Sequence, residues 1–244
     1  MDNTDNIEVL KAKLYNAEIK YSWEHMGWGG KYDHLGIWGL SIVAGYSMLG
    51  FLWLVSDDLT VDTPVFWGIF AISTIFVLIS RFLFFPDKHR CYHLTQLGIH
   101  YTEQDMVPEV AYKIVRGFAW VGIAVCVIAV FVLGPLAFVG AGAFALMAFG
   151  MTNFQPTVDD CYVLIDERSF VFNVIDDVVL SLSIPGKDGF EYVGNIFTMT
   201  LEQKMELLAQ LKLLFPEIEV IEIKRLNDKY KHPIYQRDEE EVVE

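Results

Sequence analysis

Charged residues are absent from one long part of this chain, residues 117–153, although Asp, Glu, Lys and Arg make up 20% of the sequence. Gly134 and Pro135 stand near the middle of this part. A soluble protein spaces its apolar residues at the period of a helix or a strand and does not gather them in so long a run. The stretch therefore predicts two membrane-spanning helices, 117–133 and 136–151, joined by a very tight turn.

Further absences limit the function. The sequence has no glycine-rich phosphate loop, no nucleophile elbow and no HExxH motif, so no catalytic set emerges. Residues 1–30 contain no apolar segment followed by a small-residue cleavage site, so we expect no cleavable signal peptide. There are only three cysteines, and their spacing indicates no disulfide framework, which favours a reducing compartment: Cys91, Cys126 and Cys161.

Two more apolar blocks lie earlier in the chain, at 37–55 and 65–85. A helix of this length crosses about 30 Å of hydrocarbon. The connector between the two blocks has aspartates but no Lys or Arg. The 18 Lys and Arg lie before the first block, between Arg81 at the end of the second block and the start of the third, or after the fourth. The positive-inside rule therefore predicts an integral protein of the plasma (inner) membrane with both termini cytoplasmic.

The remaining segments are expected in the cytoplasm. Residues 1–36 predict an amphipathic helix followed by a glycine-rich connector, because apolar residues recur there at spacings of three and four. Residues 86–116 predict a loop with a β-hairpin around Gly98 and a helix that begins near Pro108. Residues 152–230 predict an α/β module, and the acidic tail 231–244 is expected to be disordered.

Within the α/β module, three alternating runs predict a strand meander: 161–166, 169–175 and 178–184. Residues 185–189 are expected to form a loop. The sequence from Thr200 to Gln203 resembles a capping box, which predicts a helix that Pro216 ends, and 218–224 predicts a last strand. A module of about ninety residues is small for an independent core, so we expect the hairpin at 91–103 to join it.

The predicted fold class is thus a membrane α-helical protein with four transmembrane helices in two hairpins, 37–85 and 117–151. A small cytoplasmic α+β domain, built from the central loop and the C-terminal segment, completes it. Small residues such as Ser41 and Gly45 favour close helix packing, either within the bundle or between subunits. The spanning blocks lack ionisable residues apart from Arg81 at the end of the second, which argues against ion-coupled transport.

The most suggestive polar cluster lies at 88–93, together with His100. On a strand, His89, Cys91 and His93 point to one face, and imidazole and thiolate are zinc ligands. No fourth ligand is apparent and the spacing matches no common zinc motif. The alternative, a polar segment beside the membrane, is preferred. We therefore assign no catalytic, cofactor-binding or metal residue and expect no cofactor.

Short external connectors, a sizeable cytoplasmic part and the lack of a catalytic set favour a non-enzymatic membrane protein. It would anchor an assembly or relay signals to a cytoplasmic protein partner, as a homo-oligomer in the lipid bilayer. One alternative is an oligomeric channel gated by the cytoplasmic domain. The other is a membrane enzyme acting on lipid, with its site in the 88–100 cluster. The formal net charge of −14 argues against nucleic-acid binding.

Overall fold

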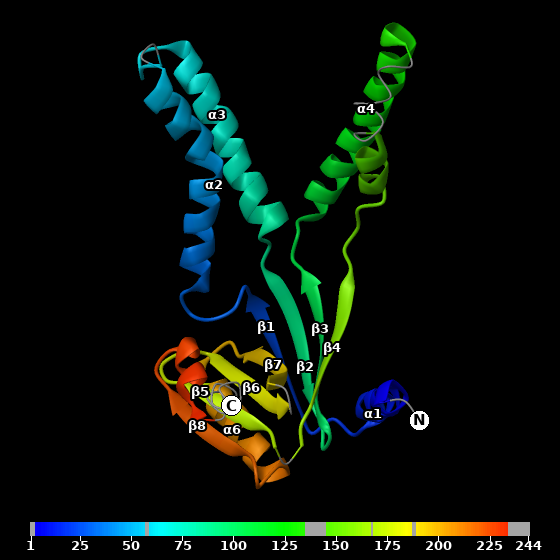
Figure 1. The fold of residues 1–244 in the computed structure, drawn as a ribbon, viewed down its shortest axis with the longest axis vertical. Coiled ribbons are helices and arrows are strands. Elements are labelled where there is room, and N and C mark those ends of the chain that lie inside the picture. The colour runs from blue at the N-terminus through cyan, green and yellow to red at the C-terminus, as the bar shows by residue number, and fades with distance from the viewer. Residues whose placement is uncertain (1–2, 57–58, 135–144, 167, 187–188, 234–244) are drawn as a thin grey trace, which may run out of the picture. The chain divides into compact units, whose positions relative to one another are not determined.

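The structure is a computed structural model, and it describes residues 3–56, 59–134, 145–166, 168–186 and 189–233. These residues form a mixed α+β fold with two four-stranded sheets and long apolar helices (Figure 1). It divides into two compact units. The sheet unit consists of Met1–Ile37, Lys88–Gln104 and Val158–Glu244, and the helical unit consists of Trp38–Asp87 and Asp105–Thr157.

Long apolar helices make up most of the helical unit: α2 (Asp33–Val55), α3 (Pro64–Ile79) with the π-helical turn η1 (Ser80–Phe84), and α4 (Glu109–Leu133). Among the described residues, three helical segments are long and apolar enough to cross a membrane, judged by length and composition alone. Their apolar side chains are largely exposed, as Leu54 at 84% and Phe131 at 85% show.

The predicted fold class is wrong. The chain is a mixed α+β protein, and the described residues form no closed membrane bundle, since the three apolar helices leave most of their surface uncovered. Composition identifies apolar segments, but it does not reveal which surfaces bury one another. The predicted turn at Gly134–Pro135 and most of the predicted helix 136–151 lie outside the described residues, as does the tail from residue 234.

Helices α2 and α3 approach closely at a small residue. A Cβ atom on Gly45 would lie less than 3.0 Å from the backbone of Val77, and the Tyr46 and Thr74 hydroxyls are 2.9 Å apart. Gly45 therefore allows close contact between α2 and α3 of the same chain. Arg81, at the end of the second apolar block, is buried, and its guanidinium pairs with the Asp87 carboxylate at 2.6 Å.

The first sheet of the sheet unit has the order β1-β2-β3-β4. Its strands are antiparallel where the register is defined, with Trp23 opposite Tyr92 and Gly98 opposite Leu164. The predicted hairpin around Gly98 is confirmed as β2 and β3. The bounds are β1 (Tyr21–Gly27), β2 (Lys88–Leu94), β3 (Gly98–Asp105) and β4 (Val158–Leu164).

Strand β1 corrects the interpretation of the N-terminal segment. The predicted helix is present as α1 (Asn3–Asn16), but the residues after it form a strand rather than a connector. The Trp23 ring stacks on Tyr92 with centroids 4.9 Å apart, and its Nε1 donates a hydrogen bond to the carbonyl oxygen of Phe197 at 3.0 Å. Burial of an aromatic ring with a satisfied N–H anchors β1 in the sheet unit.

The second sheet has the order β7-β6-β5-β8, with β5 and β8 parallel. The predicted three-strand meander is wrong in its first member, because β4 pairs with β3 in the first sheet. Part of the predicted loop 185–189 belongs to strands, and residues 187–188 lie outside the described part. The bounds are β5 (Phe170–Val174), β6 (Val179–Gly186), β7 (Gly189–Phe197) and β8 (Glu219–Ile223).

Helix α6 (Leu201–Leu214) begins as predicted. The Thr200 hydroxyl accepts a hydrogen bond from the Gln203 N–H at 3.1 Å, and the Gln203 side chain accepts one from the Met199 N–H at 2.8 Å. These bonds satisfy amide groups that would otherwise lack partners at a helix start. A short 3₁₀ helix, η2 (Leu226–Lys231), follows β8.

One hydrophobic core joins both sheets to α6. Trp23, Tyr92 and Leu180 belong to it together with Leu207 and Leu211 of the helix. Each of these five side chains is at most 4% exposed. The two sheets therefore fold around shared apolar surface, and the position of α6 is determined by its buried leucines.

Candidate functional site

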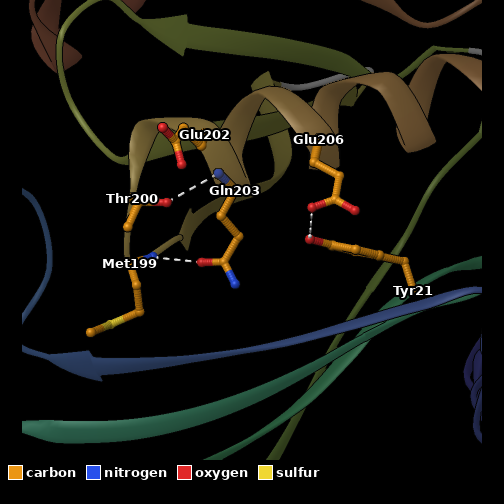
Figure 2. Close-up of a pocket in the computed structure, with 6 residues that line it drawn as sticks. All are labelled: Tyr21, Met199, Thr200, Glu202, Gln203 and Glu206. Carbon is orange, nitrogen blue, oxygen red and sulfur yellow. Dashed lines mark hydrogen bonds between the residues drawn. The ribbon is translucent and has the colours of Figure 1, made fainter.

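A pocket of about 340 Å³ lies in the sheet unit beside the start of α6. Figure 2 shows its lining side chains, which come from β1, from the segment before α6 and from the first two turns of that helix. The lining residues are Tyr21, Met199, Thr200, Glu202, Gln203 and Glu206. Two carboxylates on successive turns make this pocket acidic.

A hydrogen bond fixes one side of the pocket. The Tyr21 hydroxyl donates to Glu206 Oε2 at 3.1 Å. Burial, followed by the hydrogen bond and the charge of Glu206, raises the pKa of Tyr21 above its ordinary value. Tyr21 therefore keeps its proton at neutral pH, and its hydroxyl holds the Glu206 side chain in place at one side of the pocket. Glu202 lies one turn earlier and is exposed.

Exposed apolar side chains surround these carboxylates. Met199 is 53% exposed, Leu201 45% and Met205 62%, and the Met26 N–H donates to the Met199 sulfur at 3.3 Å. Methionine side chains adapt their shape to a partner, and charges at the edge of an apolar patch select the partner's charge. We call this area the α6 surface, and it comprises Tyr21, Met199, Leu201, Glu202, Met205 and Glu206.

None of the residues of the α6 surface was predicted from the sequence to bind a partner. The spacing of Glu202 and Glu206 gave a weak signal, because residues four apart lie on one side of a helix. The contribution of Tyr21 had no local signal, since β1 lies far from α6 along the chain.

The predicted cluster at 88–93 is divided between two faces of β2. Lys88 and Arg90 both pair with Glu103 of β3, and the Arg90 Nε lies 2.6 Å from its carboxylate. Burial opposes ionisation of Glu103, but the two cations outweigh it and hold its pKa below the usual value. Burial first, and then the charge of Arg90, lowers the pKa of His25 to about 4. These groups support the fold.

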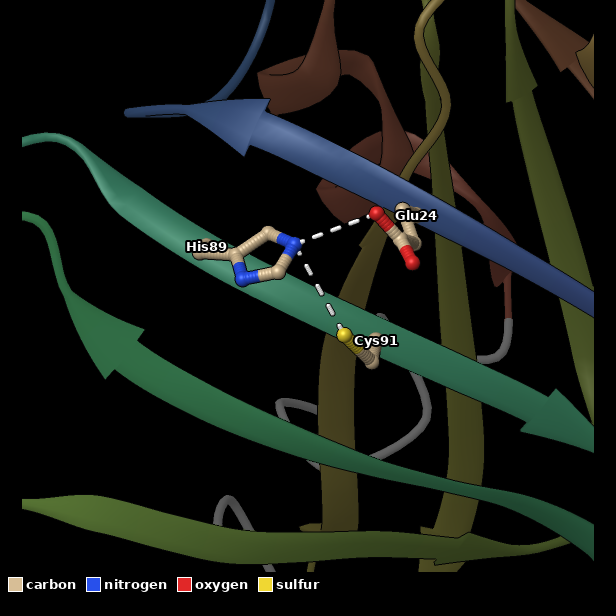
Figure 3. Close-up of side chains that lie close together, drawn as sticks. All are labelled: Glu24, His89 and Cys91. Atoms are coloured by element: carbon tan, nitrogen blue, oxygen red, sulfur yellow. Dashed lines mark hydrogen bonds and ion pairs between the residues drawn. The ribbon is translucent and has the colours of Figure 1, made fainter.

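The three predicted ligands His89, Cys91 and His93 lie on the other face of β2, and only two of them come together. The His89 Nε2 and Cys91 Sγ atoms are 3.7 Å apart, whereas the His93 ring packs on His100 with centroids 5.0 Å apart. Glu24 of β1, which the sequence did not single out, takes the third place with its Oε2 3.3 Å from His89 Nε2. Figure 3 shows these three side chains converging from β1 and β2.

Comparison with known proteins decides the family. A family model described as TsiV2 immunity protein matches residues 1–242. The chain belongs to the TsiV2 immunity protein family. A relative named Immunity protein TsiV2, from Vibrio cholerae serotype O1 (strain ATCC 39315 / El Tor Inaba N16961), is 38% identical over 235 residues, which are 96% of each chain. No solved structure matches significantly.

Membership of the TsiV2 family overturns the predicted function. The prediction of a membrane scaffold or signal relay is wrong, because the match covers nearly the whole chain and describes an immunity protein. For the same reason both alternatives, the oligomeric channel and the lipid-acting enzyme, are wrong. The predicted partners are wrong as well, because they were inferred from that function. No short motif in the sequence indicated this family, and the match that shows it extends over residues 1–242.

Proposed function

We propose that this TsiV2 family member neutralises a cognate effector toxin of a type VI secretion system by binding it, and has no enzymatic activity of its own. The family match over residues 1–242 carries this proposal. Neutralisation by binding requires an exposed surface of defined shape and charge. The α6 surface has these properties and is the surface we assign to the toxin.

The α6 surface selects the chemistry of its partner. Glu202 and the tyrosine-held Glu206 present negative charge, and the exposed Met199, Leu201 and Met205 present apolar area around it. A toxin segment with basic side chains flanked by apolar ones complements both features. Charge attraction of this kind accelerates encounter, and burial of the apolar side chains then retains the partner.

A further part of the proposal concerns location. Helices α2, α3 and α4 cross the cytoplasmic membrane, and the apolar sequence 136–151, most of which lies outside the described residues, returns the chain, so that the sheet unit with both termini lies in the cytoplasm. Apolar length and exposed apolar side chains support insertion. The first sheet supports a location of all these segments on the same side of the membrane. β1 precedes α2, β2 and β3 lie between α3 and α4, and β4 follows α4, yet all four strands belong to one sheet.

This location predicts a labelling pattern. Single cysteines replace Asp62, in the connector before α3, or Glu8 and Glu219, in the sheet unit, after the native cysteines are changed to serine. A membrane-impermeant maleimide should label Asp62→Cys in intact spheroplasts, and the other two only after the membrane is permeabilised. Labelling of Glu219→Cys in intact spheroplasts, or a purified chain that stays monodisperse without detergent, would contradict the proposal.

Reversing both charges of the α6 surface tests its role. The Glu202→Lys/Glu206→Lys variant should bind the toxin about 30-fold more weakly, since losing two exposed charge pairs costs about 1 kcal/mol each. Each type VI effector of the source strain is first co-expressed with the chain, and the one whose toxicity the chain suppresses is purified. Its affinity for the parent chain and the variant is then measured in detergent.

The matched control is Glu217→Lys/Glu219→Lys, which changes the net charge equally at exposed positions beyond the other end of α6. We expect the control to bind as the parent does and to protect cells. Equal weakening in both variants would show that net charge alone matters and would remove the α6 surface from the proposal. Failure of the chain to suppress any effector would overturn the proposed function itself.

A further inference from the structure

We propose that Glu24, His89 and Cys91 form a binding site for Zn²⁺ on the sheet unit. The site lies outside the α6 surface, and nothing in the proposed neutralisation of a toxin requires it. One carboxyl group, one imidazole and one thiol converge there from two neighbouring strands (Figure 3). All three are zinc ligands in proteins.

The distances between the three ligand atoms suit one zinc ion. Typical bond lengths place ligands of a tetrahedral zinc about 3.3 Å apart for a nitrogen–oxygen pair and about 3.6 Å apart for a nitrogen–sulfur pair. The observed separations are 3.3 Å from His89 Nε2 to Glu24 Oε2 and 3.7 Å from His89 Nε2 to Cys91 Sγ. All three atoms lie within 4.8 Å of one another, and Glu24, with a side chain 63% exposed, is free to rotate toward the thiolate.

The strand register produces this convergence. Glu24 lies directly opposite Cys91 in the antiparallel pair of β1 and β2, and His89 lies opposite Met26. Residues two apart on a strand share a face, so His89 and Cys91 point the same way, and Glu24 reaches both from the neighbouring strand. The backbone ladder therefore fixes the three Cβ positions before any ion binds.

The local charge also favours a cation. The two cationic side chains of β2, Lys88 and Arg90, pair with Glu103 and alternate in sequence with the ligand residues, which places them on the opposite face. A cross-strand ion pair would account for the contact between Glu24 and His89, but it would not require Cys91 at the same nitrogen atom. A thiolate together with an imidazole selects zinc over magnesium or calcium.

The ion would keep one coordination position open. Three protein ligands leave the fourth position of a tetrahedral zinc to water, as at zinc sites that are open to solvent. The exposure of Glu24 and the partial exposure of His89 and Cys91 give water access to this position. Because the ligands must be deprotonated, the affinity for zinc should rise with pH.

Cobalt binding tests the site directly. The full-length chain is purified in detergent, reduced and freed of metal, and then titrated with Co²⁺ and afterwards with Zn²⁺. We expect an absorption band from charge transfer between thiolate and cobalt, which Zn²⁺ abolishes by displacement. Cys91→Ser should remove the band. Glu24→Gln and His89→Gln should each weaken cobalt binding by at least about tenfold, since even outer partners of metal ligands contribute that much.

Two controls come from the same sheet. Cys161→Ser removes another partly buried thiol, and His93→Gln removes the histidine that packs on His100, and both should bind cobalt as the parent does. Absence of the thiolate band, its persistence in Cys91→Ser, or its loss in Cys161→Ser would overturn the proposal. If Cys91→Ser does not fold, the Glu24→Gln variant, which changes an exposed side chain, provides the test. An unchanged affinity of that variant for Co²⁺ would also overturn the proposal.

Discussion

Replacing Gly98 with alanine is expected to lower the free energy of unfolding of the sheet unit by about 4 kcal/mol. Gly98 has φ +144°, a conformation that side chains rarely adopt, and an added Cβ would lie less than 3.0 Å from the carbonyl oxygen of Val163. The Cα atom of Leu164 is also only 3.0 Å away. These are backbone atoms of the paired strand β4, so relief of the clash requires separating β3 from β4.

The measurement is the denaturant midpoint of the β-sheet circular dichroism signal, recorded in detergent. Gly117→Ala provides the matched control, because it adds the same atom in α4 where nothing lies within 4 Å. The control should unfold at the parent midpoint or slightly above it, since alanine favours helix over glycine. Equal midpoints for the two variants would show that Gly98 is not required for the β3–β4 pairing.

Replacing Leu211 with alanine is expected to cost about 3 kcal/mol of stability, the typical cost of a large-to-small change in a core. Leu211 is fully buried and packs in the core that joins both sheets to α6. The neighbouring atoms belong to several elements, so they collapse only partly into the space left behind. The same denaturation experiment measures the loss.

Leu213 gives an unusually close comparison for Leu211. It lies two residues later on the same helix, but its side chain is 73% exposed. Leu213→Ala removes the same atoms from solvent-facing surface and should change stability by less than about 0.5 kcal/mol. If both leucine variants lost similar stability, the assignment of α6 as a core helix of the sheet unit would be wrong.

Local sequence signals predicted the elements that depend on neighbouring residues. The start of α6 follows from Thr200 and Gln203, which cap it, and the hairpin around Gly98 follows from alternating residues on either side of a turn glycine. The apolar helices follow from composition. In each case the interacting residues lie within a few positions of one another, so the pattern is visible in a short stretch of sequence.

The pairing of strands was not predictable in the same way. β1 alternates aromatic and polar residues over only seven positions, and a long stretch of chain separates it from its partner β2. β4 resembles the first strand of a local meander, yet it pairs with β3, from which α4 separates it along the sequence. Only the tertiary fold brings these residues together, because their contacts are non-local.

The candidate site was hidden for the same reason. Tyr21 meets Glu206, and Glu24 meets Cys91, only after β1 has taken its place in the sheet unit. From the sequence, His89, Cys91 and His93 stood out as possible ligands, but in the structure Glu24 of another strand takes the place of His93. The family left no short motif in the sequence, and it is recognised from similarity over residues 1–242.

The construction of the first sheet has a consequence for synthesis of the protein. Its four strands are delivered by three separate portions of chain, and the last portion leaves the ribosome only after every long apolar helix has been made. Until β4 arrives, the nascent polypeptide carries a β3 edge with unpaired backbone amides and carbonyls. Chains that terminate before β4 therefore keep this unpaired edge permanently, and we expect quality-control proteases to remove them.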